Sequence, residues 1–182
     1  LVSDAGTPAI NDPGYELVRA ALASGFDVRP VPGPSAPVSA LAVSGLPTDS
    51  FLYLGYLPHR SSERRKSIGH VSDVTHTLIF LESPYRIVEA LEDLHALFGD
   101  RQVCVAREMT KLFEEYWRGT LGDAVTYFKS QPVRGEFTLV VAGKKQSEKE
   151  MWDEAELLAV IEKERWLGKS ARDISSELAG IS

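Results

Sequence analysis

The sequence predicts an α/β fold with more than one structural unit, and three observations lead to this prediction. Residues 1–45 read as strand, loop, helix, strand, loop and helix, which is the order of a parallel α/β unit. The later segments HTLIFLE, QVCVARE and GEFTLVVAG read as buried strands, separated by segments with helical periodicity. The composition, with 43% hydrophobic and 25% charged residues, is that of an ordinary globular chain.

The N-terminal part begins with a strand end, Leu1–Val2, followed by the turn-rich loop SDAGTPAINDPG. In the helix that follows, Asp12 is the expected N-cap, Pro13 the first residue and Gly25 the stop. FDVRP then predicts a second strand, VPGPSA a tight loop, and SAPVSALAVSG a helix of small residues that packs closely on a neighbour. Either loop alone reads as a plain connection. Because both loops follow parallel strands, the pair can equally be interpreted as a binding site for a nucleotide-like ligand.

A Gly-Leu-Pro break predicts a domain boundary near residues 46–48. We expect residues 1–46 to belong to a first α/β domain, which the resemblance described below implies is a C-terminal remnant, and 47–145 to form a second domain with a mixed sheet. Residues 146–182 are expected to form a linker and a helical tail, with short helices over 153–165 and 170–178. The second domain is predicted to contain, in order, FLYLGY (strand), RSSERRKSIGHV (helix), HTLIFLE (strand), YRIVEALEDLHALFG (helix), QVCVARE (strand), LFEEYWRGTL (extended), GDAVTYFKSQ (helix) and GEFTLVVAG (strand).

Composition and residue spacing restrict the function classes. The net charge of −6 argues against a wholly electrostatic nucleic-acid binder, but it leaves a local basic face open. Cys104 is the only cysteine and the four histidines are scattered, so we expect neither a disulfide nor a metal site. No apolar run approaches the roughly 20 residues of a membrane helix, and no basic, apolar leader is present. The expected location is therefore cytoplasmic, without a membrane partner.

Six motifs occur in a fixed order: SDAGTPAINDPG, VPGPSA, GLPTDSFLYLGYLP, LIFLESPYR, AREMTKLFEE and GEFTLVVAG. Together they resemble the ribosomal RNA small-subunit methyltransferase I family, which belongs to the tetrapyrrole methylase-like class. The resemblance covers residue 1 to about residue 143. Family members begin with a further strand and a TPIGNLGD-like loop, so the resemblance implies that the first domain is incomplete here.

The resemblance implies a two-domain fold, a homodimer, and S-adenosyl-L-methionine bound in the cleft between the domains. It also implies methylation of a cytidine ribose 2′-OH in the decoding region of 16S ribosomal RNA, within the small subunit. Two alternatives stay open. One is a tetrapyrrole methyltransferase making corrin or sirohaem precursors, and the other is a non-catalytic binding module of the same fold.

Site residues follow from matching these motifs. A ribose hydroxyl needs a base, or a cation that lowers its pKa, and the charged strand ends supply candidates for that role. The basic segment around RSSERRKS is open to two interpretations, an RNA contact or a solvated helix face with internal ion pairs. The matched cofactor residues are Ala5, Gly6, Thr7, Ile10, Ser35, Ala36, Leu81 and Ala106; the catalytic candidates are Lys111, Glu108 and Glu82, with Glu114 considered beside them; the RNA-binding candidates are Arg60, Arg64, Arg65, Arg86 and Arg107.

Overall fold

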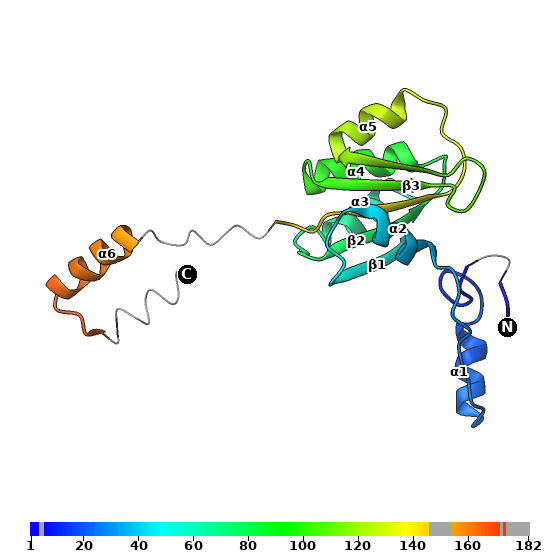
Figure 1. Cartoon of the computed structure of the whole chain (residues 1–182), viewed down its shortest axis with the longest axis horizontal. Helices are drawn as coiled ribbons and strands as arrows, with labels where there is room; N and C mark the ends of the chain where they lie inside the picture. Colours follow the sequence, from blue (N-terminus) through cyan, green and yellow to red (C-terminus); the bar gives the residue numbers. More distant parts are fainter. Residues whose placement is uncertain (4–5, 146–153, 172, 174–182) are drawn as a thin grey trace. The chain divides into compact units, whose positions relative to one another are not determined.

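The computed structural model describes residues 1–3, 6–145, 154–171 and 173, and the chain divides into two units, Leu1–Lys144 and Lys145–Ser182. The helices are α1 (Tyr15–Ala23), α2 (Ala36–Ser44), α3 (Ser61–Gly69), α4 (Ile87–Phe98), α5 (Leu121–Lys129) and α6 (Glu154–Trp166). The strands are β1 (Phe51–Tyr56), β2 (Thr77–Glu82), β3 (Gln102–Arg107), β4 (Glu115–Thr120) and β5 (Phe137–Val141). Figure 1 shows the elements along the chain.

The five strands form one mixed sheet in the order β1-β2-β5-β3-β4. β1 pairs parallel with β2, whereas β5 is antiparallel to both β2 and β3, and β4 is antiparallel to β3. It follows that β1, β2 and β3 run in the same direction. Their carboxyl ends, together with the amino ends of β4 and β5, lie at one edge of the sheet, which we call the carboxyl edge.

Both faces of the sheet are buried, as the nearly continuous apolar strands predict. Side chains alternate between the faces because successive residues of a strand point in opposite directions. On one face, Phe80, Val105 and Leu139 pack with α3, α4 and α5 in the larger core. On the other face, Ile79 and Ala106 pack with α2 in a smaller core. The result is three layers, with α2 on one side of the sheet and three helices on the other (Figure 1).

α2 lies close to the sheet because small side chains meet there. Ala40 of α2 and Ala106 of β3 are both fully buried. At the C-terminal end of α2, the Arg118 guanidinium of β4 donates to the Val43 carbonyl, with the Nε–O distance at 3.2 Å. This contact satisfies one of the carbonyls that a helix end leaves unpaired. The predicted helix of small residues is confirmed, and its N-terminus is fixed at the carboxyl edge.

The N-terminal part differs from the sequence prediction. Leu1–Val2 and the FDVRP segment are not strands, and the helix begins at Tyr15 rather than after Asp12. A strand needs a partner for its backbone groups, and no other part of residues 6–50 is extended into a ladder beside them. α1 is amphipathic in sequence, yet it has no buried residue. The separate first domain over 1–46 stays a prediction.

The remaining elements match their predicted segments within a few residues, and the mixed α/β class is confirmed. The tail helix predicted over 153–165 is observed as α6, whereas most of the helix predicted over 170–178, and most of the linker, lie outside the described residues. Over the ranges that the structure describes, no helix has the length and apolar character needed to cross a membrane.

Candidate functional site

A cleft of about 910 Å³ opens at the carboxyl edge of the sheet. This volume lies within the range of roughly 300–1,000 Å³ that small-molecule sites occupy. Three parts of unit Leu1–Lys144 form its walls: the N-terminal loop, the start of α2, and the loop between β3 and β4. The lining residues include Ile10, Asn11, Asp12, Pro34, Ser35, Ala36, Ser39, Tyr56, Leu81, Met109, Thr110, Lys111 and Glu136.

The two turn-rich loops meet directly at this cleft. The Thr7 hydroxyl donates a hydrogen bond to the Pro34 carbonyl at 3.0 Å, which joins the first loop to the second. Gly6 has a φ of 73°, a conformation that favours glycine, and a Cβ added to Gly6 would lie 3.9 Å from the same carbonyl oxygen. The second loop leads into α2, whose N-terminal residues Ser35 and Ala36 line the cleft. The pairing of loops that the sequence suggested is therefore observed, although no strand precedes either loop.

An ion-pair network holds the loop between β3 and β4. The Lys111 ammonium lies 3.0 Å from Glu108 Oε1 and 3.2 Å from Glu136 Oε2. Glu108 Oε1 also accepts a hydrogen bond from the Glu136 backbone N–H at 2.9 Å. The hydrogen bond from Lys111, followed by the one from that N–H, lowers the pKa of Glu108. The two carboxylates raise the pKa of Lys111, so its side chain stays cationic near neutral pH.

Backbone strain gathers beside the cleft. In the described part of the chain, the non-glycine residues with positive φ are Ala9, Asn11, Glu108 and Thr110. All four lie on the two loops that form the cleft walls. Non-glycine residues adopt this conformation at a cost of about 1 kcal/mol or more, and such residues cluster at binding sites. Strain at this location supports a functional role for the cleft.

Most of the predicted cofactor residues come together in the cleft. Gly6, Ile10, Ser35, Ala36 and Leu81 all line it. Thr7 sits beside it through its bond to Pro34, and Ala5 lies outside the described residues. Ala106 is the exception, because it is fully buried between β3 and α2 and does not line the cleft. Its side chain packs between the sheet and α2, and its expected cofactor contact, like those of the other residues, stays a prediction.

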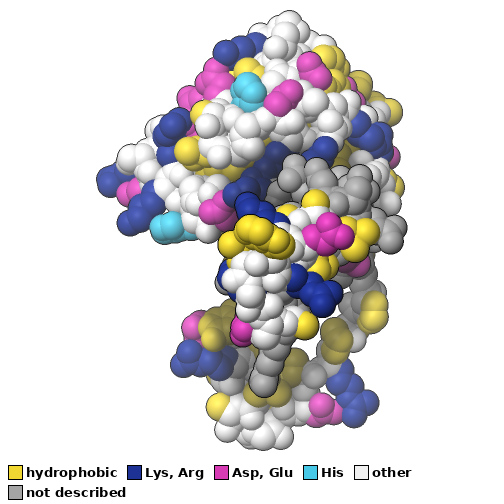
Figure 2. Space-filling view, turned by 90° about the vertical axis from the view of Figure 1, so that its left-hand side faces the viewer, with side chains coloured by type: hydrophobic (Ala, Val, Ile, Leu, Met, Phe, Trp, Pro, Cys, Tyr) yellow, Lys and Arg dark blue, Asp and Glu magenta, His cyan; other side chains and the backbone are white. Residues whose placement is uncertain are grey.

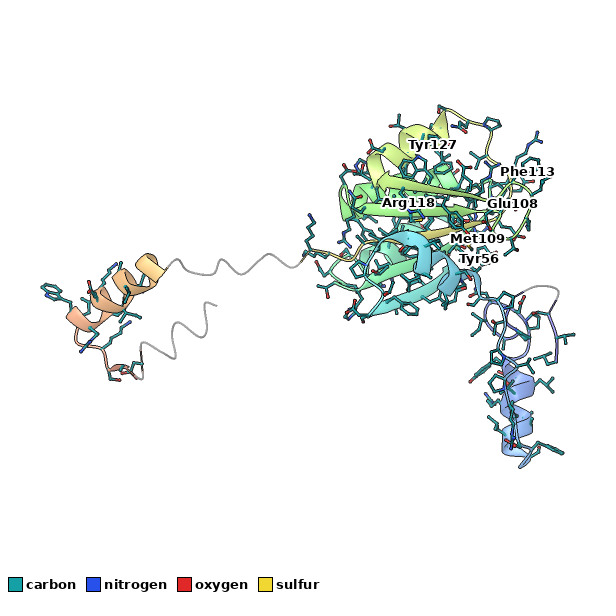
Figure 3. The ribbon with its side chains drawn as sticks, viewed as in Figure 1. Tyr56, Glu108, Met109, Phe113, Arg118 and Tyr127 are labelled. Atoms are coloured by element: carbon teal, nitrogen blue, oxygen red, sulfur yellow. The ribbon has the colours of Figure 1, made fainter. Side chains whose placement is uncertain are left out.

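Of the catalytic candidates, Lys111 lines the cleft and Glu108 holds it there. Glu114 accepts a hydrogen bond from the Thr110 backbone at 2.5 Å and so supports the same loop. Figure 3 shows Glu108, Met109 and Tyr56 at one edge of the sheet, with Phe113 further out on the loop. Lys111 therefore presents a cation to the cleft, and the catalytic roles of these residues stay predictions.

Glu82 occupies a different environment from Lys111. Its carboxylate is buried at the end of β2, and Oε1 lies 2.7 Å from the Arg86 guanidinium and 2.7 Å from the Ser83 backbone nitrogen. Arg86 also donates to the Leu57 carbonyl at 3.1 Å. This pair ties the ends of β1 and β2 together. The second carboxylate oxygen, Glu82 Oε2, is buried without a hydrogen-bond partner among the described residues, and the catalytic role of Glu82 and the RNA contact of Arg86 stay predictions.

The predicted RNA-binding arginines separate into exposed and buried ones. Arg60 is exposed, and Arg65 is half-exposed beside Asp93. Arg64, in contrast, is buried, with its Nε 2.7 Å from Asp93 and its Nη2 3.2 Å from Glu89. The guanidinium is enclosed between α3 and α4, and the RNA contact expected of Arg64 stays a prediction. Arg107 has only a fifth of its side chain exposed and pairs with Glu115.

Charge on the surface is mixed. On the face that Figure 2 shows, Lys and Arg side chains are interspersed with Asp and Glu. Within the described ranges, no group of three or more His, Cys, Asp and Glu residues is placed to hold a metal ion.

Several lining residues were not predicted from the sequence. Asn11 and Glu136 belong to motifs that the sequence analysis quotes, but nothing in their residue types marked them as cleft residues. Tyr56 reaches the cleft because β1 is irregular: the register with β2 shifts between Tyr53 and Gly55. A glycine inside an aromatic strand is the signal that could have indicated this bulge.

Comparison with known proteins agrees with the fold. The tetrapyrrole (corrin/porphyrin) methylases match residues 1–125. Proteins named ribosomal RNA small subunit methyltransferase I are 46% identical in Halalkalibacterium halodurans (over 85% of this chain and 54% of that protein) and 43% identical in Xylella fastidiosa (over 99% and 67%). The solved methyltransferase CobJ superposes with a TM-score of 0.56 over 76% of this chain and 62% of its own, at 20% identity.

The CobJ likeness establishes the fold alone, whereas the sequence matches establish the family. The chain spans 54% of the length of the first relative and 67% of the second. The family match covers both turn-rich loops, the whole of β1 to β4, and the cleft loop between β3 and β4. The chain therefore belongs to the tetrapyrrole (corrin/porphyrin) methylase family and, within it, to the group named ribosomal RNA small subunit methyltransferase I.

Proposed function

We propose that this chain is part of a methyltransferase that transfers a methyl group from S-adenosyl-L-methionine to small-subunit ribosomal RNA. In its finer form, the proposal names the 2′-OH of a cytidine in the decoding region of 16S ribosomal RNA as the acceptor. The observation that carries the proposal is the cleft. Two loops of the family's motifs converge there with Lys111, in a chain 46% identical to a protein named for this activity.

The residues of the cleft suit S-adenosylmethionine. The cofactor carries a carboxylate and a polar nucleoside on a body of small-molecule size, and the cleft has a matching volume. The N-terminus of α2 opens into the cleft at Ser35 and Ala36, and a helix N-terminus favours a negative group. Gly6 lets the backbone approach a ligand without a side chain in between. Leu81 and Ile10 supply apolar contact.

In this proposal Lys111 acts as a cation. S-adenosylmethionine, when bound, supplies the methyl group and a sulfur that leaves with the bonding electron pair. The acceptor hydroxyl is a weak nucleophile at neutral pH and reacts better as negative charge develops on its oxygen. A fixed ammonium beside that oxygen stabilises the charge, and its raised pKa keeps Lys111 protonated for this task. The hydroxyl proton passes to solvent at the open cleft.

The experiment supplies radiolabelled S-adenosylmethionine to the full-length protein together with small subunits that lack the modification. We expect label in 16S ribosomal RNA at one cytidine, as an alkali-resistant dinucleotide, because 2′-O-methylation blocks strand cleavage at that ribose. Transfer to a base instead of a ribose would overturn the finer proposal. Transfer to a tetrapyrrole and not to RNA would overturn the substrate class.

A binding measurement separates enzyme from binding module. Calorimetry with S-adenosylmethionine should give saturable binding to the full-length protein. Saturable binding without transfer to any of these acceptors would favour the non-catalytic alternative. The expected homodimer is tested in the same samples by light scattering, where a monomer would contradict it.

A further inference from the structure

The β1 strand contains a bulge that turns one aromatic side chain toward the cleft. Tyr53 pairs with Ile79, but Gly55 pairs with Phe80 and Tyr56 with Leu81, so Leu54 is the extra residue. One inserted residue reverses the faces of the residues that follow it. Tyr56 is therefore placed on the face of Ile79 and Leu81, where it lines the cleft. Without the bulge it would point toward the larger core.

Asn11 of the N-terminal loop occupies the space beside that bulge. A Cβ added to Gly55 would lie 2.8 Å from Asn11 Nδ2 and 3.0 Å from Oδ1, so the missing side chain of Gly55 makes room for the Asn11 amide. The Tyr53 hydroxyl donates a hydrogen bond to Asn11 Oδ1 at 2.5 Å. Gly55 and Asn11 both have positive φ, of 64° and 58°. Two residues with left-handed backbone, a glycine and an asparagine that both tolerate it, therefore meet at one contact.

We propose that Tyr53, Gly55 and Asn11 form a latch that fixes the ligand loop of residues 6–14 on β1, making Asn11 and Tyr53 positioning residues for cofactor binding. A second hydrogen bond, from the Thr7 hydroxyl to the Pro34 carbonyl, attaches the same loop to the loop that leads into α2. Asn11 and its neighbours Ile10 and Asp12 all line the cleft. The latch sets where these groups stand before a ligand arrives, and preorganisation of this kind raises affinity.

The latch depends on the proposed function in one respect only, the identity of the ligand as S-adenosylmethionine. Burial, first, and then the nearby Tyr56 and Asp12 raise the pKa of Tyr53, so its hydroxyl remains a donor well above neutral pH. Asparagine tolerates positive φ better than most residues, and its amide oxygen lies within hydrogen-bond distance of the Tyr53 hydroxyl. These features account for the choice of residue at both ends of the contact.

The test uses three variants of the full-length protein. Tyr53→Phe removes only the hydroxyl, Asn11→Gly removes the amide without adding backbone strain, and Asn11→Asp keeps an acceptor oxygen. Tyr15→Phe, on the exposed surface of α1, is the matched control. We expect Tyr53→Phe and Asn11→Gly each to raise the KM for S-adenosylmethionine about three- to tenfold, the usual effect of one hydrogen bond, with little change in kcat. Asn11→Asp should retain most of the wild-type affinity for S-adenosylmethionine.

Hydrogen exchange of the ligand-free protein gives a readout that needs no cofactor. Amides of residues 6–14 should exchange faster in Tyr53→Phe and Asn11→Gly than in wild type and Tyr15→Phe. The double variant of Tyr53→Phe and Asn11→Gly should exchange no faster, and have no higher KM, than the more affected single variant, because both changes remove the same hydrogen bond. Unchanged exchange and unchanged KM in both single variants would overturn the latch. If wild-type protein binds no S-adenosylmethionine, the proposed function fails, while the exchange measurement still decides the latch.

Discussion

Lys111 combines an exposed position in the cleft with a fixed one. Half of its side chain is exposed, yet its ammonium is held by carboxylates from two different strand ends. Glu108 belongs to the loop after β3, and Glu136 precedes β5, so the cation is placed by the sheet rather than by its own flexible stem. A lysine used as a general base would need a lowered pKa, and this environment raises it.

Lys111→Ala should therefore lower the rate of methyl transfer by about 10²-fold, the typical effect of losing one preorganised charge-stabilising group. Affinity for S-adenosylmethionine should change far less. Lys111→Arg, which keeps the charge, should retain more activity than Lys111→Ala. Lys129→Ala removes an ion pair with Glu92 between α5 and α4, away from the cleft, and serves as the control. Single-turnover rates at saturating cofactor measure the effect, and wild-type rates in Lys111→Ala would remove Lys111 from the mechanism.

The carboxylate of Glu108 predicts a pH dependence of stability. Its folded-state pKa lies below the ordinary value of 4.5, so the native protein binds fewer protons than the unfolded chain in this range. The stabilisation is fully present above the ordinary pKa and is lost as the pH falls through the lowered one. Lys111 has a raised pKa, so its share is lost only as the pH rises through that value, above the ordinary 10.5.

We expect Glu108→Gln to unfold more easily than wild type at neutral pH, because it keeps the acceptor oxygen but loses the charge opposite Lys111. The difference in free energy of unfolding should shrink steadily below about pH 4.5. Urea unfolding at a series of pH values between neutral and strongly acidic measures it. A difference that stays constant down to the lowest pH would show that the ion pair does not stabilise the fold.

At the scale of elements, the contact between α3 and α4 depends on a buried ion pair. Arg64 and Asp93 have 3% and 9% of their side chains exposed, and Arg65 shares the same carboxylate. Arg64 Nη1 is buried without a hydrogen-bond partner among the described residues. The net contribution of a buried ion pair to stability is small. Removal of only one partner is much more destabilising, because the other charge stays buried and loses its partner.

Asp93→Ala should destabilise the protein by about 3 kcal/mol, since it leaves the buried Arg64 guanidinium with Glu89 as its remaining ion-pair partner. Glu63→Ala, which breaks the exposed pair between Arg60 and Glu63, should cost about 1 kcal/mol or less. Replacing both buried partners, with Arg64→Met and Asp93→Leu, should recover most of the loss. Denaturant titrations compare the three, and equal effects of Asp93→Ala and Glu63→Ala would contradict the burial argument.

The close packing of α2 on β3 gives Ala106 its role. A larger side chain there has no space, because the residue is fully buried against Ala40 and Leu41. Ala106→Leu should cost about 1–3 kcal/mol of stability through overpacking. It should also weaken cofactor binding, because α2 carries Ser35 and Ala36 into the cleft. Ala42→Leu, on the exposed side of the same helix, should do neither. A tolerated Ala106→Leu would show that α2 adjusts freely.

The same examples show what the sequence could predict. HTLIFLE reads as a buried strand because its apolar run is nearly continuous, which is a local property of the sequence, and both faces of β2 are indeed covered. The role of Arg64 is not local: it lies in a basic run, and its partner Asp93 is 29 residues away in the chain. Tyr56 faces the cleft only because a bulge precedes it, and strand periodicity alone assigns it to the opposite face.

At the scale of the whole molecule, the motif order predicted the family and the fold class, and both are confirmed. Of the eight cofactor residues expected from the motifs, five line one cleft in the structure. The strands expected within residues 1–35 were wrong, because a strand depends on a partner that the local pattern does not specify. Motif matching could not predict the burial of Ala106, because that burial depends on α2, which belongs to a distant part of the chain.

Both hydrophobic cores lie between Ala40 and Val141, inside unit Leu1–Lys144. Removal of residues 146–182 should therefore change the free energy of unfolding of the sheet unit by no more than about 0.5 kcal/mol. Trp117 reports on this unit alone, because it stacks on Tyr127 at a ring-centroid distance of 5.6 Å, whereas the other two tryptophans leave with the tail. Phe80→Ala, in the buried centre of β2, is the positive control and should cost about 3–5 kcal/mol in both lengths of chain. Urea unfolding followed by Trp117 fluorescence compares the two. A clear fall in the unfolding midpoint of the shortened chain would show that the second unit stabilises the sheet, and the division into two independent units would then be wrong.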